Sequence, residues 1–335
     1  MTGSDGKTTT TTLIAKILEH AGHRVWVGGN IGAPLLPQAA DMTPADIAVV
    51  ELSSFQLMTM ERSADIAVVT NVAPNHLDVH KDMAEYVQAK KNVFEYQNET
   101  GKVVLNYDND ITRGFAADAK GTVEFFSRLA RPENGVYLED GVICRNGKKI
   151  MAAADIRIPG VHNIENYMAA IAAVDGVVPD KCVRAVAKRF TGVEHRIEFV
   201  RELDGVRYIN DSKGTNVDST IKAIQTMTRP TAIILGGYDK HCDFTPMVQE
   251  MLMSPYIKEA VLIGATADQI ERTCRENGYT HLHRAGTLKD AIDQCRKLSS
   301  DGWNVLLSPA CASFDMFSDY ESRGRIFKEL VRELK

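Results

Sequence analysis

The sequence predicts an α/β protein with two parallel sheets, and three observations carry this prediction. Short apolar runs of strand character alternate with helical patterns along the whole chain. At 335 residues the chain is long for a single hydrophobic core, which favours two domains. A glycine-rich turn stands directly before a helix at residues 3–8, as in phosphate-binding loops. We therefore expect a P-loop-type nucleotide-binding domain that lacks its first strand, followed by a Rossmann-like doubly wound α/β domain.

The elements of the first domain follow from the spacing of its apolar residues. Its helices are expected at residues 8–20, 84–97, 163–174 and 181–189. Its strands are expected at residues 46–51, 65–71, 103–106, 123–126 and 136–144, the last containing a hairpin around Glu139-Asp140-Gly141.

The second domain begins after a helix that ends in glycine, in the stretch TGVEHRIE at residues 191–198. This stretch separates a first domain at residues 1–190 from a second at residues 191–335. Beyond it, strands are expected at residues 206–210, 231–236, 260–263 and 303–308, alternating with helices at residues 216–227, 266–277, 287–298 and 320–333. The alternation predicts a second doubly wound sheet.

Composition argues against several classes of function. A net charge of −5 argues against a general nucleic-acid surface. No apolar run approaches the ~18–20 residues of a membrane span, and the N-terminus has no signal-peptide pattern. The six cysteines contain no CxxC pair, which is typical of reduced thiols and gives no zinc signature. We expect a cytoplasmic monomer that acts on small molecules, without nucleic-acid partners or membrane insertion.

The glycine loop, residues 3–8, carries the first candidate site. Backbone N–H groups at a helix start converge on one point, where the helix dipole favours an anion. Lys7 can neutralise β- and γ-phosphate oxygens, and the hydroxyl of Thr8 or Thr9 is placed to bind magnesium. The full G-x-x-x-x-G-K-[ST] pattern fails, because its first glycine would fall on Met1. A glycine turn that only caps a threonine-rich helix remains the alternative.

Two later strand ends support a nucleotide site. The run DIAVVE at residues 46–51 ends in Glu51, a carboxylate that could reach magnesium on a neighbouring phosphate loop. The run DIAVVTN at residues 65–71 is followed by a cluster of His76, Asp78 and His80. Open α/β sheets place their sites at the carboxyl ends of strands. Each feature also has an ordinary structural interpretation, and only their combination favours a metal site.

Ten ordered segments carry a resemblance to a known family. They are TGSDGKTTTT, GGNIGAPL, VVELSSFQL, TNVAPNHLD, AKKNVF, GVHNIEN, GVEHRIE, INDSKGTN, LGGYDKHCDF and LLSPACASFDMF, spread from Thr2 to Phe317. With these segments the chain resembles the Mur ligases, ATP-dependent amide-bond ligases of peptidoglycan synthesis. The last two segments resemble the member that adds D-glutamate. The resemblance implies ligation of D-glutamate to UDP-N-acetylmuramoyl-L-alanine through an acyl phosphate, with ATP and two magnesium ions.

The resemblance also implies roles for residues of the first domain. Lys7 would act on the γ-phosphate, with Thr8 and Glu51 at the first magnesium ion. His76 would lie at the second magnesium ion, although Asn75 stands where many members carry aspartate. Lys90 would be carried as a carbamate, with the adjacent Lys91 as the competing assignment. The further implied contacts are ATP at Gly3, Ser4, Asp5, Gly6, Thr9, Asn163 and Asn166, and the muramoyl substrate at Asn30.

Residues of the second domain complete the implied site. His195 and Arg196 would stand at the start of this domain, and Arg196 would reach the phosphates. Asp211 and Lys213 would lie near the ribose and phosphates, and Lys240, Ser313 and Phe314 would form the D-glutamate pocket. Simpler interpretations remain open: a surface arginine at 196, a turn at 211 and a helix N-cap at 313. Cys311 has no implied histidine partner and is interpreted as a small buried thiol.

Two rival functions and one expectation about the start of the chain remain. A folylpolyglutamate-synthase-like ligase shares fold and chemistry, and a noncatalytic nucleotide-binding fragment is the alternative outside enzymology. The resemblance implies an N-terminal UDP-binding domain and a strand before the glycine loop, and neither is present. A central parallel strand is buried on both faces. We therefore expect a poorly stable, weakly binding chain with an open slot beside the strands ending at Glu51 and Asn71, and a normally folded second domain. A version extended upstream by the native reading frame would test this.

Overall fold

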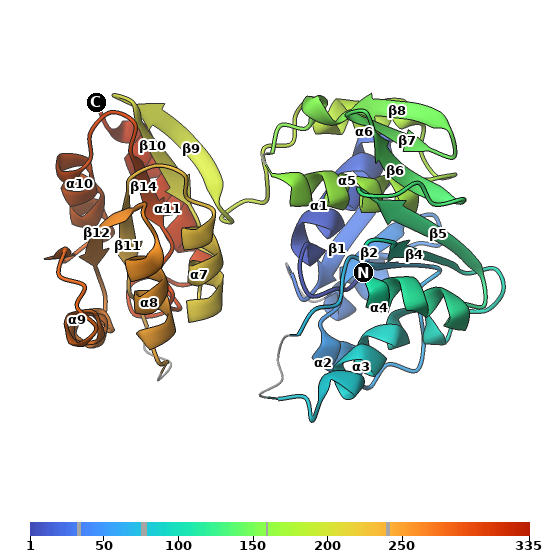
Figure 1. Ribbon diagram of the computed structural model, residues 1–335, viewed down its shortest axis with the longest axis horizontal. Helices are drawn as coiled ribbons and strands as arrows, with labels where there is room; N and C mark the ends of the chain where they lie inside the picture. The colour runs from blue at the N-terminus through green and yellow to red at the C-terminus, as the bar shows by residue number, and fades with distance from the viewer. Residues whose placement is uncertain (32–34, 75–78, 159, 239–241) are drawn as a thin grey trace. The chain divides into compact units, whose positions relative to one another are not determined.

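The computed structural model describes residues 1–31, 35–74, 79–158, 160–238 and 242–335, and these form two compact units. The first unit is Met1–Thr191 and the second is Gly192–Lys335 (Figure 1). The division lies one residue beyond the boundary expected from the sequence. Each unit is an α/β sandwich with its own core.

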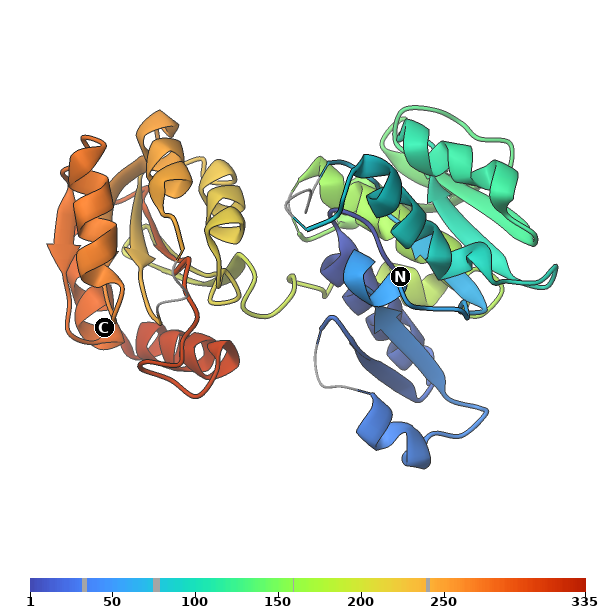
Figure 2. The same ribbon diagram turned by 90° about the horizontal axis from the view of Figure 1, so that it is seen from below.

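The first unit contains two ladders of strands. The larger has the order β3 (Ile66–Val69), β4 (Lys102–Asn106), β5 (Thr122–Ser127), β6 (Gly135–Glu139), β7 (Val142–Arg145) and β8 (Lys148–Ala152). It is parallel from β3 to β6 and antiparallel beyond, because tight turns join the last three strands. The predicted hairpin around Asp140 is the β6–β7 turn. In the smaller ladder β1 (Val25–Gly29) pairs in parallel with β2 (Ile47–Glu51), and Figure 2 shows them side by side in blue.

Met1 and Thr2 lie between these two ladders. The Leu52 N–H donates to the carbonyl of Met1 at 2.8 Å on one side. On the other side the Thr2 N–H donates to Val68 O at 2.9 Å, and Thr2 forms a parallel bridge with Val69. Within the described residues, this pair alone links β2 to β3. The arrangement brings the glycine loop to the edge where β2 and β3 end.

Helices cover both faces of the first unit's sheet. One face carries α1 (Lys7–His20), α5 (Val161–Val174) and α6 (Asp180–Ala187), packed through a core that includes Leu13, Ile17 and Ile171. The other carries α2 (Ser54–Leu57), α3 (Met83–Glu95) and α4 (Asp110–Gly114). The threonines of α1 have poor helix propensity, so its stability comes from this apolar face. Short 3-10 turns lie at Leu36–Asp41, Phe115–Asp118 and Ala153–Asp155.

The second unit has one six-stranded sheet. Its order is β13 (Leu282–Arg284), β12 (Ile257–Leu262), β11 (Thr231–Leu235), β14 (Asn304–Leu307), β10 (Val206–Asn210) and β9 (Glu198–Leu203). All neighbours are parallel except β9, which runs antiparallel to β10. Helices α7 (Val217–Gln225), α8 (Thr245–Met253) and α9 (Ala267–Glu276) pack on one face, and α10 (Leu288–Leu298) and α11 (Tyr320–Glu333) on the other (Figure 1).

The strand order of the second unit reverses direction between β11 and β14. The chain moves outward from β11 to β13 and then returns through α10 to place β14 between β11 and β10. Open α/β sheets bind ligands outside the carboxyl ends of strands at such a reversal. Here the loops after β11 and β14 meet, since the Tyr238 N–H donates to Ala312 O at 2.9 Å. The sequence patterns had missed α8 and β13. They indicated a strand run starting at the stretch 191–198, where β9 begins, but not its antiparallel direction.

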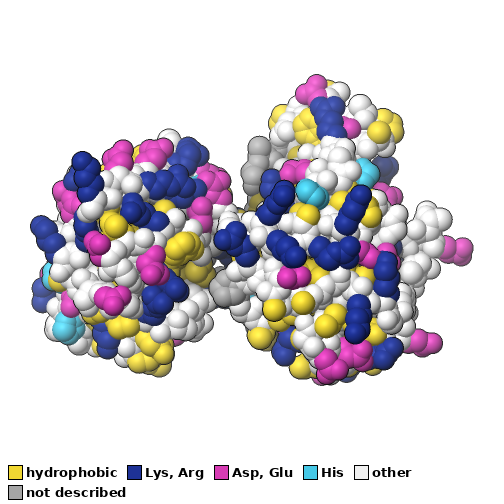
Figure 3. Space-filling view, turned by 90° about the horizontal axis from the view of Figure 1, so that it is seen from above, with side chains coloured by type: hydrophobic (Ala, Val, Ile, Leu, Met, Phe, Trp, Pro, Cys, Tyr) yellow, Lys and Arg dark blue, Asp and Glu magenta, His cyan; other side chains and the backbone are white. Residues whose placement is uncertain are grey.

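The surface carries charges of both signs. On the face drawn in Figure 3, Lys and Arg side chains are interspersed with Asp and Glu. Among the described helices, none combines the length and apolar character needed to cross a membrane.

Candidate active site

The glycine loop makes two contacts that only glycine permits. Gly3 and Gly6 have φ angles of 149° and 77°, in the region that side chains avoid. A Cβ atom at Gly3 would lie 1.9 Å from Thr70 Oγ1, and one at Gly6 would lie 2.3 Å from Asn166 Oδ1. Both the turn and its close approach to β3 and α5 therefore require glycine.

The end of β3 fixes the shape of this loop. The N–H groups of Ser4 and Asp5 both donate to Asn71 Oδ1, at 3.1 and 2.8 Å. The Thr70 hydroxyl donates to the carbonyl of Asp5 at 2.5 Å, and the Ser4 hydroxyl lies 2.9 Å from that of Tyr86 on α3. The predicted strand end at residue 71 thus holds the loop directly.

The N-terminus of α1 has no side-chain cap. Gly6 is the N-cap and provides no side-chain cap, so no side chain of that residue satisfies the first backbone N–H groups. Thr8 is buried in this turn and Thr9 is half-buried. Lys7 folds over the loop, where its Nζ donates to the carbonyls of Gly3 and Ser4 at 2.9 and 2.8 Å.

Glu51 is a buried carboxylate with one oxygen unsatisfied. It is 1% exposed, and its Oε1 accepts a hydrogen bond from Asn30 Nδ2 at 3.0 Å. Its Oε2 has no hydrogen-bond partner among the described residues. Burying such an atom is costly unless a donor or cation reaches it, so the carboxylate fits a metal ion. Asn30, predicted to bind the muramoyl substrate, is engaged here with Glu51.

The donor set fits magnesium better than a transition metal. No cluster of three His, Cys, Asp or Glu ligands is found in the described part of the chain. Magnesium bound with a nucleotide commonly uses one or two carboxylates, phosphates and water, and the single buried carboxylate of Glu51 fits such a donor set. His76, predicted at the second ion, lies outside the described residues.

Lys90 contacts the glycine loop and Lys91 does not. The Nζ of Lys90 donates to Gly3 O at 2.9 Å and lies 4.6 Å above the ring of Tyr86. The side chain of Lys91 instead pairs with Asp118 at 2.9 Å. This geometry favours Lys90 over Lys91 as the lysine of the site. Burial, and then the charge of Lys7, lowers the pKa of the Lys90 ammonium to about 7.

Asn163 and Asn166 lie together beside the loop. The Asn166 Nδ2 donates to Asn163 Oδ1 at 3.1 Å, and the Thr10 hydroxyl donates to Asn166 Oδ1 at 3.1 Å. Both asparagines are buried on α5. The first unit therefore brings together the glycine loop, Glu51, Lys90 and this pair.

Asp211 is a buried carboxylate among the predicted residues of the second unit's site, at 3% exposed. Its Oδ1 accepts from the Ile197 N–H at 3.1 Å, and its Oδ2 accepts from the Ser308 hydroxyl at 2.7 Å. Burial raises the pKa of this carboxyl to about 7. The turn interpretation also holds, because the Gly214 N–H donates to the Asp211 carbonyl at 2.8 Å. The side-chain carboxylate has a second role beside this turn: its hydrogen bond with Ser308 joins the loop after β10 to the loop after β14.

We predict that Asp211 makes stability fall as pH rises. Its folded-state pKa exceeds the ordinary value of 3.8, so between pH 4 and 7 the folded state binds more protons than the unfolded state. The stabilisation that the Asp211 carboxyl gives the folded state is complete below about pH 4 and is lost above about pH 7. The melting temperature of Asp211→Asn, relative to the parent, should therefore rise from pH 5 to pH 8. A constant difference across this range would contradict the prediction.

The residues predicted for the amino-acid pocket are only partly described. Ser313 is buried in the loop after β14, and the N–H groups of Met316 and Phe317 donate to its carbonyl. Phe314 is 64% exposed, with its ring 6.1 Å from that of Tyr238. Lys240 lies outside the described residues. Cys311 is a buried thiol, as predicted, and burial raises its pKa to about 11.

The sequence patterns had missed Arg323 of α11. This arginine is 1% exposed and donates to the Ser212 hydroxyl at 2.9 Å and to the Cys311 carbonyl at 3.1 Å. It thereby joins the loops after β10 and β14. In an amphipathic helix with several arginines and lysines, nothing in the sequence pattern distinguishes this buried arginine from its exposed neighbours.

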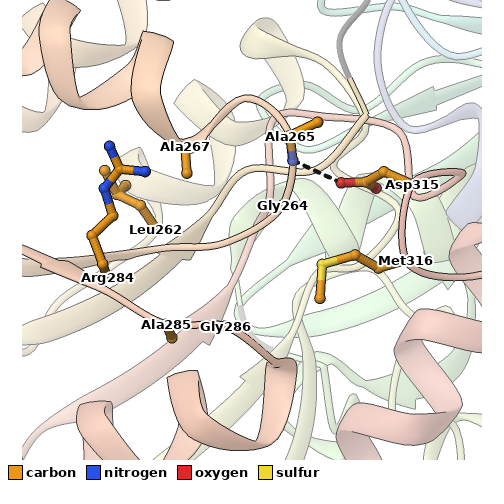
Figure 4. Close-up of a pocket in the computed structure, with 9 residues that line it drawn as sticks. All are labelled: Leu262, Gly264, Ala265, Ala267, Arg284, Ala285, Gly286, Asp315 and Met316. Carbon is orange, nitrogen blue, oxygen red and sulfur yellow. Dashed lines mark hydrogen bonds between the residues drawn. The ribbon is translucent and has the colours of Figure 1, made fainter.

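A cavity of about 670 Å³ opens elsewhere in the second unit. It lies at the carboxyl ends of β12 and β13 and is lined by Leu262, Gly264, Ala265, Ala267, Arg284, Ala285, Gly286, Asp315 and Met316 (Figure 4). Asp315 accepts from the Ala265 N–H at 2.9 Å, and Arg284 pairs with two carboxylates of α9. Of the predicted site residues that the structure describes, none lines this cavity, although Asp315 and Met316 directly follow Ser313 and Phe314 in the sequence.

Comparison with known proteins identifies the class. Residues 1–174 match the Mur ligase middle domain, and residues 195–311 match the Mur ligase, glutamate ligase domain. The chain belongs to the Mur ligase family. It is 47% identical over 339 residues to the UDP-N-acetylmuramoylalanine--D-glutamate ligase of Clostridium botulinum, covering 100% of this chain and 74% of that protein. The ligase of the same name from Acetivibrio thermocellus is also 47% identical, with the same coverage.

Solved structures share the fold at lower identity. The UDP-N-acetylmuramate-alanine ligase of Thermotoga maritima matches with a TM-score of 0.64 and 20% identity, covering 100% of this chain and 75% of that one. The Mycobacterium tuberculosis folylpolyglutamate synthase, complexed with ADP, matches with a TM-score of 0.68 and 14% identity, covering 100% and 90%. These likenesses establish a mixed α/β fold with mainly parallel sheets, as expected from the sequence.

Proposed function

We propose that the chain joins D-glutamate to UDP-N-acetylmuramoyl-L-alanine with ATP, forming an amide bond in peptidoglycan synthesis. The observation that carries this proposal is identity of 43–47% across the whole chain to ligases of that name. The site geometry supports it, because the glycine loop, a half-satisfied Glu51 and a buried lysine gather at one sheet edge. Such a group suits phosphoryl transfer.

The reaction requires activation of a carboxylate, since an amine does not displace oxide. The L-alanyl carboxylate takes the γ-phosphoryl group of ATP, giving an acyl phosphate and ADP. The amine of D-glutamate then attacks the acyl carbon, loses a proton, and expels phosphate. In this scheme the N–H groups of the glycine loop bind phosphate, and Lys7 leaves the carbonyls of Gly3 and Ser4 for the transferring oxygens. Water must be excluded while the acyl phosphate exists.

The proposal also assigns ligands to the magnesium ions and a chemical state to Lys90. Thr8, Glu51 and His76 would hold two magnesium ions, which disperse charge on the phosphoryl group. Lys90 would react as the neutral amine with carbon dioxide, forming an N–C bond and releasing one proton. Its pKa of about 7 makes the neutral amine abundant near neutral pH. The carbamate would change a cation beside Lys7 into an anion suited to orienting a metal.

The remaining predicted residues divide between nucleotide and amino acid. Asn163 and Asn166 would contact the nucleotide from α5, and Arg196, Asp211 and Lys213 would do so from the second unit. Ser313, Phe314 and Lys240 would bind D-glutamate. We further propose a monomer that works in the cytoplasm.

The amino-acid assignment predicts a selective defect. Lys240→Ala should raise the KM for D-glutamate roughly 10–100-fold, the range for losing a charged hydrogen bond worth ~1.5–3 kcal/mol. The KM for ATP should change far less. Lys258→Ala, at an exposed lysine on β12, is the matched control. Equal effects on both substrates would remove Lys240 from the amino-acid pocket.

Phosphate release tests the proposed function as a whole. The purified protein should release phosphate from ATP only when both the muramoyl-alanine nucleotide and D-glutamate are present. Release that follows a folate and glutamate instead would favour the folylpolyglutamate-synthase-like alternative. ATP binding without release under any combination would favour a noncatalytic fragment.

A further inference from the structure

The backbone on both sides of Arg196 adopts the left-handed conformation. The φ angle is 63° at His195 and 46° at Ile197. Isoleucine is branched at Cβ, so this conformation is strongly disfavoured at position 197. Such a conformation persists only where surrounding contacts over-determine it, and it often marks a functional site.

Hydrogen bonds hold three successive N–H groups of this segment. The His195 N–H donates to Glu198 Oε2 at 2.9 Å, and the Arg196 N–H donates to Val193 O at 3.1 Å. The Ile197 N–H donates to Asp211 Oδ1 at 3.1 Å. In addition, the Lys213 N–H donates to the His195 carbonyl at 2.9 Å. These bonds therefore fix the direction in which the Cα–Cβ bond of Arg196 leaves the backbone.

Glu198 is the centre of this network. Besides the His195 N–H, its Oε2 accepts from Asn210 Nδ2 at 3.0 Å, and its Oε1 accepts from Lys328 Nζ at 3.1 Å. Asn210 also contacts His195 Nδ1 at 2.9 Å, which fixes the buried imidazole as well as the backbone. A carboxylate at position 198 thus binds one backbone donor, one amide and one cation.

We propose that Glu198 is a positioning residue, which aims Arg196 by holding the left-handed segment at residues 195–197. This inference rests on the proposed function, in which Arg196 contacts the phosphates of ATP. Glu198 itself touches neither substrate nor metal in this scheme. Its effect passes entirely through the backbone of His195 and the guanidinium of Arg196.

Glu194 provides a matched control. It also pairs with Lys328, but its side chain is 62% exposed. The hydrogen bonds from the His195 N–H and from Asn210 go to Glu198. Glu194 also lies 3.7 Å from His195 Nε2, so removing it tests its contacts with Lys328 and the imidazole, whereas removing Glu198 also removes the backbone anchor.

A double-mutant cycle tests the proposal. Glu198→Ala should lower the rate of product formation at least tenfold and weaken ATP binding, with little change in the KM for D-glutamate. In the Arg196→Ala background the same change should have almost no further effect, because the residue acts through Arg196. Additive effects of the two changes, or an equal loss in Glu194→Ala, would overturn the proposal.

A second pair of variants separates geometry from folding. Asparagine tolerates the left-handed conformation and valine does not, so Ile197→Asn should melt above Ile197→Val and keep activity. The reverse order would contradict a held left-handed segment. The cycle is measured first on binding of a nonhydrolysable ATP analogue, which needs no ligation. If the parent protein makes no product, the proposed function fails, while non-additive analogue binding still decides the role of Glu198.

Discussion

In the Lys7→Ala variant we expect the ligation rate to fall on the order of 10²–10³-fold or more, with the fold intact. The lysine ammonium would serve oxygens whose charge develops during phosphoryl transfer, so its loss acts on the transition state. In the structure its Nζ donates to two loop carbonyls, those of Gly3 and Ser4. Two such bonds contribute modestly to stability, at about 1 kcal/mol each.

Phosphate release measures the expected loss of ligation rate, and thermal unfolding measures whether the fold stays intact. Lys16→Ala is the control, because Lys16 lies on the same helix but is exposed and pairs with Glu19. It should retain both activity and melting temperature. Near-normal turnover in Lys7→Ala would contradict the proposed role of the glycine loop in phosphoryl transfer.

Lys90→Ala should be nearly inactive, and acetate should restore part of its activity. A small carboxylate can occupy the space left by a carbamate and supply the lost negative charge. Lys90 reaches the loop at Gly3 O, whereas Lys91 pairs with Asp118, so Lys91→Ala is the matched control and should ligate normally. Intact-protein mass spectrometry at neutral pH, with added bicarbonate, should detect the carbon dioxide adduct.

Two findings together would refute the carbamate. They are a bare amine at Lys90 in a crystal map and by mass spectrometry, and normal turnover in Lys90→Ala. Rescue by chloride as efficient as that by acetate would show that a carboxylate is not what the site lacks.

The sequence predicted the parts of the site that depend on local patterns. Gly3, Gly6 and Lys7 stand in a motif that physical chemistry can interpret, and Glu51 ends a recognisable strand. The sequence also predicts that the glycine loop and Glu51 lie near each other, because the carboxyl ends of parallel strands share one edge of the sheet. The helix at residues 320–333 was predicted with its observed bounds, since its apolar period is regular.

What the sequence could not give depends on contacts between distant residues. The spacing from Tyr86 already favoured Lys90 over Lys91, but their contacts with Gly3 O and with Asp118 depend on the direction of each side chain from α3. Glu198 and Arg323 lie in patterns typical of exposed charged residues, and only tertiary packing makes Glu198 half-buried and Arg323 fully buried. The direction of β9 is a different case: Asp204-Gly205 is a local hairpin signal that the sequence contains and that was not used to predict antiparallel pairing with β10.

Arg323 has a consequence for the order in which the second unit matures. It joins Ser212 to Cys311, and its bond to Ser212 spans 111 positions of the sequence. Such contacts of high sequence separation are entropically costly to close and form late. Ribosomal synthesis proceeds from the N-terminus, so until α11 has left the exit tunnel the loops after β10 and β14 lack the Arg323 bonds and are joined through the Asp211–Ser308 hydrogen bond.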